Sequence, residues 1–122
     1  MKGLFEGRKI LVVEDEMLVL MSVNITLEDL GYTDISVASN VAAALALVAR
    51  NTFDAALLDV NLGSERSYPV AEALLQLGIP FAFSTGYGDL GDRPDLATRP
   101  LLRKPYFAED IGAVFKTLLE GD

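Results

Sequence analysis

Short runs of apolar residues recur along the chain at intervals of about 20 to 25 residues. The first, third and fourth runs are apolar at every position. This pattern is typical of strands in a parallel sheet that is covered by helices on both faces. We therefore expect five strands, at residues 10–13, 35–38, 55–58, 81–83 and 101–102.

The segments between these runs have helical character. Gly31 and Gly78 are signals for the end of a helix, and Asn40 is a favourable N-cap residue. Pro69 precedes a further apolar segment, as expected at the start of a helix. The predicted helices cover residues 16–30, 40–50, 70–77 and 107–119.

The alternation of strand and helix predicts an α/β fold with a doubly wound parallel sheet. One connection departs from the pattern, because residues 86–95 contain three glycines and a proline. These residues disfavour a helix. The fourth helix is therefore expected to be weak or missing. At 122 residues the chain is expected to form a single domain, residues 1–122.

Composition narrows the possible chemistry. The chain has no cysteine and no histidine, which excludes disulfides, thiolate or imidazole catalysis and the common zinc sites. A bound metal would therefore be a hard ion held by oxygen atoms. A hydrophobic content of 51% excludes intrinsic disorder.

The charge and the apolar runs indicate where the protein acts. Eighteen acidic and ten basic residues give a net charge of −8, which disfavours direct binding to nucleic acid. The longest apolar run, residues 41–49, is far shorter than the roughly 20 residues that span a bilayer. We expect a cytoplasmic protein that contacts neither nucleic acid nor membrane.

Polar residues with useful chemistry follow four of the predicted strands. They are Glu14-Asp15-Glu16, Asp59, Ser84-Thr85 and Lys104-Pro105. Ligands of open parallel sheets bind beyond the carboxyl ends of the strands. Crowded carboxylates favour a divalent cation such as Mg²⁺, and a lysine can neutralise a phosphoryl oxygen. The set fits transfer of a phosphoryl group to a carboxylate.

Each of these residues also has a simpler interpretation when taken alone. The acids after the first strand suit the first turn of a helix, and Asp59 suits the turn that follows it. Thr85 lies in an ordinary turn sequence, and Lys104 could be a solvated lysine before a helix. Four such coincidences at one edge of a sheet are improbable, which favours the functional interpretation.

The combined motif resembles a response-regulator receiver domain of two-component signalling, from residue 9 to residue 119. The resemblance implies a flavodoxin-like receiver fold with strand order 2-1-3-4-5, in which Asp15 faces Asp59 across the switch point. Residues 83–88 are similar to the Phe-Ala-Thr-Gly-x-Tyr signature of a mainly alphaproteobacterial subfamily, except that Tyr87 comes one position early.

The resemblance also implies a role for each site residue. Asp59 would be the phosphoacceptor, Thr85 the switch hydroxyl and Lys104 the counter-ion of the phosphoryl group. A Mg²⁺ or Mn²⁺ ion would be held by Asp15, Asp59 and the backbone carbonyl of Asn61, with Glu14 in the outer shell. No other cofactor is implied, and the Lys104–Pro105 peptide bond is often cis in this family.

One departure from the family concerns how the signal leaves the site. Many receivers have an aromatic residue three positions before the lysine, where this chain has Leu101. Residues 87–94 are therefore expected to carry the signal instead, by becoming ordered on phosphorylation.

The implied donor is a sensor histidine kinase or a histidine phosphotransfer protein, and a downstream protein partner is expected. The apolar segment 17–25 could form a docking face for the donor, although helix packing with gap-filling methionines is the simpler interpretation.

Three alternative functions remain open. A flavodoxin-like cofactor domain conflicts with the acids after the first strand, which would repel a phosphate. A haloacid-dehalogenase-like phosphatase would have an aspartate in place of Asn61. A receiver-like interaction domain or phosphate sink without its own output is the remaining alternative.

Overall fold

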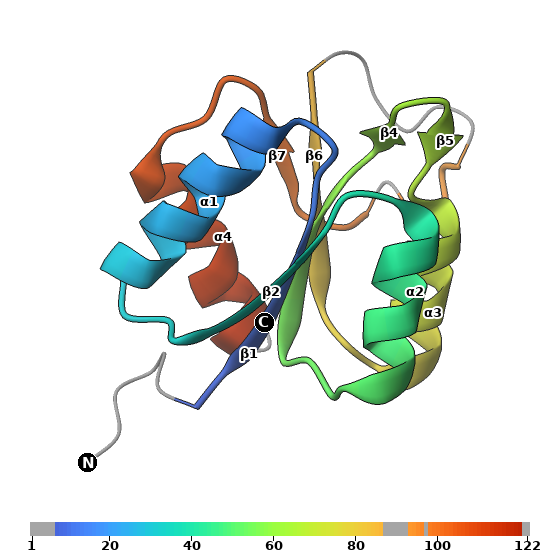
Figure 1. The fold of residues 1–122 in the computed structure, drawn as a ribbon, viewed down its shortest axis with the longest axis horizontal. Helices are drawn as coiled ribbons and strands as arrows, with labels where there is room; N and C mark the ends of the chain where they lie inside the picture. The colour runs from blue at the N-terminus through green and yellow to red at the C-terminus, as the bar shows by residue number, and fades with distance from the viewer. Residues whose placement is uncertain (1–6, 87–92, 97, 121–122) are drawn as a thin grey trace.

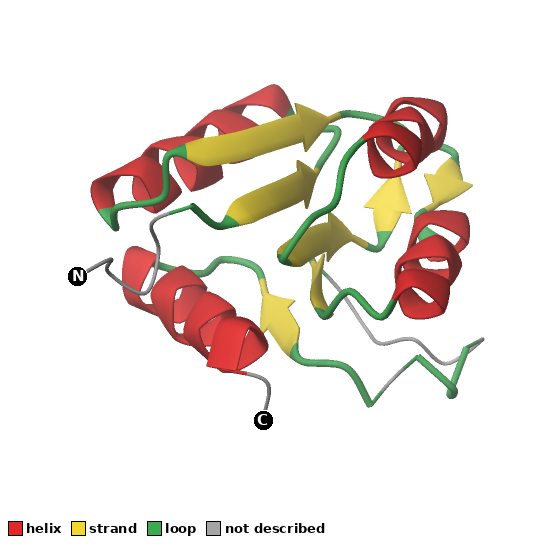
Figure 2. Ribbon diagram, turned by 90° about the horizontal axis from the view of Figure 1, so that it is seen from below, coloured by secondary structure: helices red, strands yellow, loops and turns green. Residues whose placement is uncertain are grey.

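A five-stranded parallel sheet forms the centre of the molecule (Figure 2). The structure is a computed structural model, and it describes residues 7–86, 93–96 and 98–120. The strand order of the sheet is β2-β1-β3-β6-β7, which is the expected order 2-1-3-4-5 because two short strands intervene in the chain. The strands are β1 (Lys9–Val13), β2 (Asp34–Ala38), β3 (Ala55–Asp59), β6 (Phe81–Thr85) and β7 (Leu101–Arg103).

Two pairs of helices cover the sheet. Figure 1 shows α1 and α4 on one face and α2 and α3 on the other. The bounds are α1 (Met17–Asp29), α2 (Val41–Arg50), α3 (Tyr68–Leu77) and α4 (Ala108–Glu120). All four predicted helices are present, and each end lies within two residues of its predicted position. The Asn40 side chain caps α2 by accepting a 2.8 Å hydrogen bond from the Ala43 amide, and Gly78 ends α3 with a φ of 72°.

The two faces have separate cores because side chains alternate along a strand. Leu11 and Val13 of β1 pack toward α2 and α3, whereas Ile10 and Val12 pack toward α1 and α4. Every residue of β3 and β6 is buried. These central strands therefore provide a rigid base for the residues at their carboxyl ends.

The sequence analysis missed a small hairpin directly after β3. Strands β4 (Asn61–Leu62) and β5 (Glu65–Arg66) pair antiparallel around a turn in which Gly63 has a φ of 65°. Each strand has only two residues, which is too short to produce a periodic pattern. The hairpin holds Asn61 beside the carboxyl end of β3.

The connection from β6 to β7 agrees with the expectation of a weak or missing helix. The described residues of this connection (86, 93–96 and 98–100) contain no helix, and residues 87–92 lie outside the described part of the chain. Leu96 anchors the connection, because its side chain is fully buried in the core beneath α2 and α3.

Aromatic rings hold the same connection at two further points. The Arg93 guanidinium lies 5.3 Å from the centre of the Tyr68 ring, and that of Arg99 lies 5.6 Å from the Phe81 ring. Between them, Phe83 makes edge contacts with Tyr68 and Phe81, at centroid distances of 6.4 Å and 5.4 Å. The five side chains form a continuous chain of contacts from Arg93 to Arg99.

No helix in the described residues is long and apolar enough to cross a membrane.

Candidate functional site

The predicted site residues lie together at the carboxyl edge of the sheet. Asp59 and Thr85 are the last residues of β3 and β6, and Lys104 follows β7 directly. Strand register aligns them, since Asp59 is paired with Ser84 and Thr85 is paired with Arg103. Parallel strands end at the same edge, so residues distant in the chain become neighbours.

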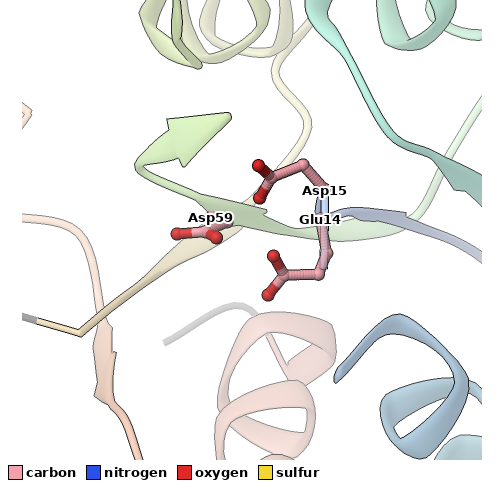
Figure 3. A group of neighbouring side chains, drawn as sticks. All are labelled: Glu14, Asp15 and Asp59. Atoms are coloured by element: carbon pink, nitrogen blue, oxygen red, sulfur yellow. The ribbon is translucent and has the colours of Figure 1, made fainter. Parts of the chain in front are cut away.

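Three carboxylates meet at this edge and form what we call the acidic cluster: Glu14, Asp15 and Asp59 (Figure 3). One oxygen atom from each lies within 4.8 Å of the others. Glu14 is 3% exposed and Asp59 is 4% exposed, whereas Asp15 is open to solvent. The cluster therefore has two buried members and one that a solvated ion can reach.

Lys104 is the cation of the site. Its Nζ lies 3.0 Å from Glu14 Oε1, 3.1 Å from Asp59 Oδ2 and 3.2 Å from Glu16 Oε1. The contact with Glu16 was missed by the sequence analysis, which included Glu16 among the acids after the first strand but gave it no role in the site. The sequence feature that could have revealed it is the position of Glu16 directly after Glu14 and Asp15.

One lysine does not balance this many carboxylates. Burial and a hydrogen bond with Asp59 raise the pKa of Glu14 from 4.5 to about 7. Burial alone would lower the pKa of Lys104, but its contacts with Glu14 and Asp59 raise it overall. Lys104 is thus fixed in its charged form, and the acidic cluster retains excess negative charge at neutral pH.

Backbone hydrogen bonds position the remaining residues. The Lys104 amide donates to the Thr85 carbonyl at 2.9 Å, which brings these two residues side by side. Thr85 is buried, and the Lys104–Pro105 peptide bond is cis, as expected. The Asn61 amide lies 3.4 Å from Asp59 Oδ1 and so orients the Asp59 carboxylate.

An open pocket of about 330 Å³ lies over these groups. Its lining includes the exposed carboxylates of Asp15 and Glu16. The residues are Asp15, Glu16, Asp59, Asn61, Gly63, Gly86 and Lys104. The arrangement can hold a hard cation and an anionic group together beside the Asp59 carboxylate.

Comparison with known proteins identifies the family. The family model of the response regulator receiver domain matches residues 10–106. This chain belongs to that family. Receiver domains are the phosphoacceptor modules of two-component response regulators, which confirms the functional class expected from the strand-end residues.

Solved receiver structures share the whole architecture. SdrG from Sphingomonas melonis Fr1 is 41% identical with a TM-score of 0.82, over 97% of this chain and 99% of SdrG. The BeF3-activated conformation of SdrG, from Pseudomonas melonis Fr1, is 42% identical with a TM-score of 0.78, over 98% and 99% of the two chains. A CheY-like receiver from Methanospirillum hungatei JF-1 is 25% identical with a TM-score of 0.82, over 93% and 94%. A search of curated proteins gave no match.

The receiver domain has a second cavity, an apolar groove of about 490 Å³ that we call the α1–α4 groove. Leu18, Val19 and Ser22 of α1 line one side, and Phe107 and Ile111 line the other. Glu16, Gly86 and Lys104 line both this groove and the acidic pocket, so the two cavities share a rim.

The simpler interpretation of α1 is wrong for its outer face. Leu18 is 83% exposed, and Met17, Met21 and Ile25 are each more than half exposed. These side chains therefore fill no gaps in the core. The buried residues of α1 are Leu20, Val23 and Leu27, which leaves a continuous apolar surface beside the site.

Tyr106 is a further residue whose role the sequence did not reveal. Its ring packs against the core beneath α1 and α4, and its hydroxyl is hydrogen-bonded to the Ser84 side chain. Burial and the nearby charge of Glu14 raise its pKa. Tyr106 thus braces the segment after Lys104 against the end of β6. Tyr87 lies outside the described residues.

Proposed function

We propose that this chain, as a single receiver domain over residues 1–122, accepts a phosphoryl group on Asp59 in a Mg²⁺-dependent reaction. The observation that carries the proposal is the 3.1 Å contact between Lys104 Nζ and Asp59 Oδ2 beside the acidic cluster. The expected donor is the phosphohistidine of a sensor histidine kinase or a histidine phosphotransfer protein. The chain promotes only its own phosphorylation and dephosphorylation.

Each residue has a role that follows from its position. The Asp59 carboxylate attacks phosphorus, while the Lys104 ammonium contacts a phosphoryl oxygen and neutralises its charge. The Thr85 hydroxyl, at the end of the neighbouring strand β6, would donate a hydrogen bond to a second phosphoryl oxygen. The Asn61 amide keeps the Asp59 carboxylate in orientation by its 3.4 Å contact.

The donor set fits Mg²⁺ or Mn²⁺. Carboxylate oxygens within 4.8 Å of one another suit a small hard ion. Burial and a hydrogen bond with Asp59 raise the pKa of Glu14, and a nearby cation would favour its ionised form. Asp15, Asp59 and the Asn61 carbonyl would hold the ion directly. Glu14 is buried against Lys104 and would act from the outer shell. When bound, the ion supplies positive charge to the phosphoryl oxygens.

The finer family assignment is also a proposal. Residues 83–88 resemble the Phe-Ala-Thr-Gly-x-Tyr subfamily, and the 41% identity to SdrG supports that assignment. The SdrG structure in a BeF3-activated conformation supports activation of this chain by phosphoryl-like anions. Position 101, which is paired with Phe83 in the sheet, is a leucine, so it has no aromatic ring that could follow Thr85.

The α1–α4 groove is the proposed docking site of the donor. Its exposed apolar wall and its shared rim with the acidic pocket would place a donor helix beside Asp59. Helix-in-groove recognition uses this kind of apolar surface. If the folded wild-type protein accepts no phosphoryl group from any donor, the chain is instead an interaction domain without phosphoryl transfer.

Intact-mass measurement tests the proposal. The protein is incubated with Mg²⁺ and acetyl phosphate or phosphoramidate, and it should gain the mass of a single phosphoryl group. Asp59→Asn should gain none, whereas the matched variant Asp34→Asn, at an exposed position on β2, should behave as wild type. Phosphorylation of Asp59→Asn at the wild-type rate would overturn the assignment.

A further inference from the structure

Glu16 is the acidic side chain that belongs to both cavities. It lines the acidic pocket over Asp59 and also the α1–α4 groove. Its side chain is 64% exposed, unlike the buried carboxylates of Glu14 and Asp59. Any donor that reaches Asp59 from the groove must therefore pass close to the Glu16 carboxylate.

Local contacts hold Glu16 in this place. Its Oε1 lies 3.2 Å from Lys104 Nζ, which itself lies 3.1 Å from Asp59 Oδ2. Its backbone amide donates a 3.1 Å hydrogen bond to Glu14 Oε2. These contacts place the Glu16 carboxylate on the solvent side of the lysine, at the rim through which a leaving group would depart toward the groove.

The contact of Glu16 with Lys104 has little value as a structural support. Lys104 already has two buried carboxylate partners, and an exposed ion pair contributes little stability. The main consequence of Glu16 is a fixed negative charge at the entrance to the site.

We propose that Glu16 is a specificity-determining residue that favours phosphodonors with a nitrogen–phosphorus bond over acyl phosphates. The proposal rests on phosphoryl transfer to Asp59. It concerns the leaving group of the donor, which is the part that faces Glu16.

The two classes of donor differ in the charge of that leaving group. In a phosphoimidazole, the Asp59 oxygen forms a bond to phosphorus while the nitrogen–phosphorus bond breaks, and its electron pair stays on the ring. The proton on the other ring nitrogen makes the departing imidazole neutral, and Glu16 can accept a hydrogen bond from that N–H. In an acyl phosphate, the oxygen–phosphorus bond breaks and the electron pair leaves on a carboxylate anion, which Glu16 repels.

The size of the effect follows from electrostatics in a largely hydrated pocket. Two unit charges about 5 Å apart interact there weakly, equivalent to about a three- to five-fold change in rate. Added salt screens this interaction, because the charges face solvent.

The experiment compares wild type, Glu16→Gln and the matched control Glu28→Gln, which makes the same charge change at an exposed position near the other end of α1. Initial phosphorylation rates are measured by intact mass with acetyl phosphate and with phosphoramidate, at saturating Mg²⁺ and at low and high salt. Glu16→Gln should react about three- to five-fold faster with acetyl phosphate at low salt, and no faster with phosphoramidate. High salt should reduce the difference, and Glu28→Gln should match wild type.

The other outcomes overturn the proposal in distinguishable ways. If Glu16→Gln changes both rates by the same factor, Glu16 acts only through Lys104 and does not select the donor. If both rates of Glu16→Gln equal those of wild type, Glu16 has no influence on transfer and the proposal is likewise overturned. If wild type takes up no phosphoryl group from either donor, the proposed function fails together with the inference.

Discussion

Lys104 and Arg93 each contact more than one carboxylate, but the electrostatic results are opposite. Around Lys104 the carboxylates outnumber the cation and two are buried, and the pKa of Glu14 is raised to about 7. Around Arg93 the charges are exposed and well satisfied, and the guanidinium lowers the pKa of Asp95. The surroundings of Lys104 thus disfavour the ionised form of Glu14, whereas those of Arg93 favour the ionised form of Asp95.

This difference separates a functional site from a structural contact. Buried like charges destabilise a fold unless a further cation or a proton joins them, so their presence at the Asp59 pocket indicates a ligand. Arg93 instead pairs with Glu72 of α3 at 3.0 Å and lies over the ring of Tyr68, which fastens the β6–β7 connection to α3. Substitutions at the two clusters should therefore have unlike consequences.

The largest effect is expected from Lys104→Met. This change leaves the acidic cluster without its cation, and we expect the free energy of unfolding without divalent cation to fall by about 3 kcal/mol near pH 8. The loss should shrink at lower pH, because protonation of the carboxylates relieves the repulsion. Chemical denaturation in EDTA at several pH values measures both trends. A loss that is independent of pH would contradict the electrostatic explanation.

Glu14→Gln should have the next largest effect, and in the opposite direction. Because the folded protein raises the pKa of Glu14 from 4.5 to about 7, folded Glu14 stays protonated while unfolded Glu14 ionises. Wild-type stability is therefore reduced as the pH rises from about 4.5 to about 7, and this cost is absent below the unfolded pKa. Relative to wild type, Glu14→Gln should gain about 2 kcal/mol across that range. The free energy of unfolding of both proteins is measured against pH by chemical denaturation. A constant difference between them across this range would show that Glu14 does not titrate as proposed.

Metal binding should distinguish the exposed and buried members of the acidic cluster. Asp15 is open to solvent and is proposed as a direct ligand, whereas Glu14 is tied to Lys104. Asp15→Ala should weaken Mg²⁺ binding about ten-fold or more, and Glu14→Gln only a few-fold. Titration followed by fluorescence or NMR shifts gives the ranking, and the reverse order would refute the assignment.

The fold and most of the site could be predicted because both depend on contiguous sequence. Apolar runs locate the strands, and parallel strands bring Asp59, Thr85 and Lys104 to one edge whatever the details of packing. The pairing of Lys104 with Glu16 joins residues 88 positions apart and depends on side-chain direction, which no local pattern records. The exposure of Leu18 was also beyond reach, since the apolar residues of α1 lie on more than one side of the helix and their pattern does not specify which side faces the core.

The smallest effect is expected from Arg93→Gln. The ion pairs of Arg93 are at the surface, and such pairs contribute little to global stability. Global stability and the rate of phosphorylation should therefore stay close to wild type, with Glu72→Gln as a control for one of the two ion pairs.

The change caused by Arg93→Gln should be local. The Leu96 amide, which donates to the Arg93 carbonyl at 3.0 Å, should exchange with solvent faster as the connection loosens. The Asp95 carboxyl should also titrate at higher pH, because the cation that lowers its pKa has gone. NMR titration and hydrogen exchange measure both changes. A loss of stability as large as that of Lys104→Met would show that the two clusters differ less than their charges suggest.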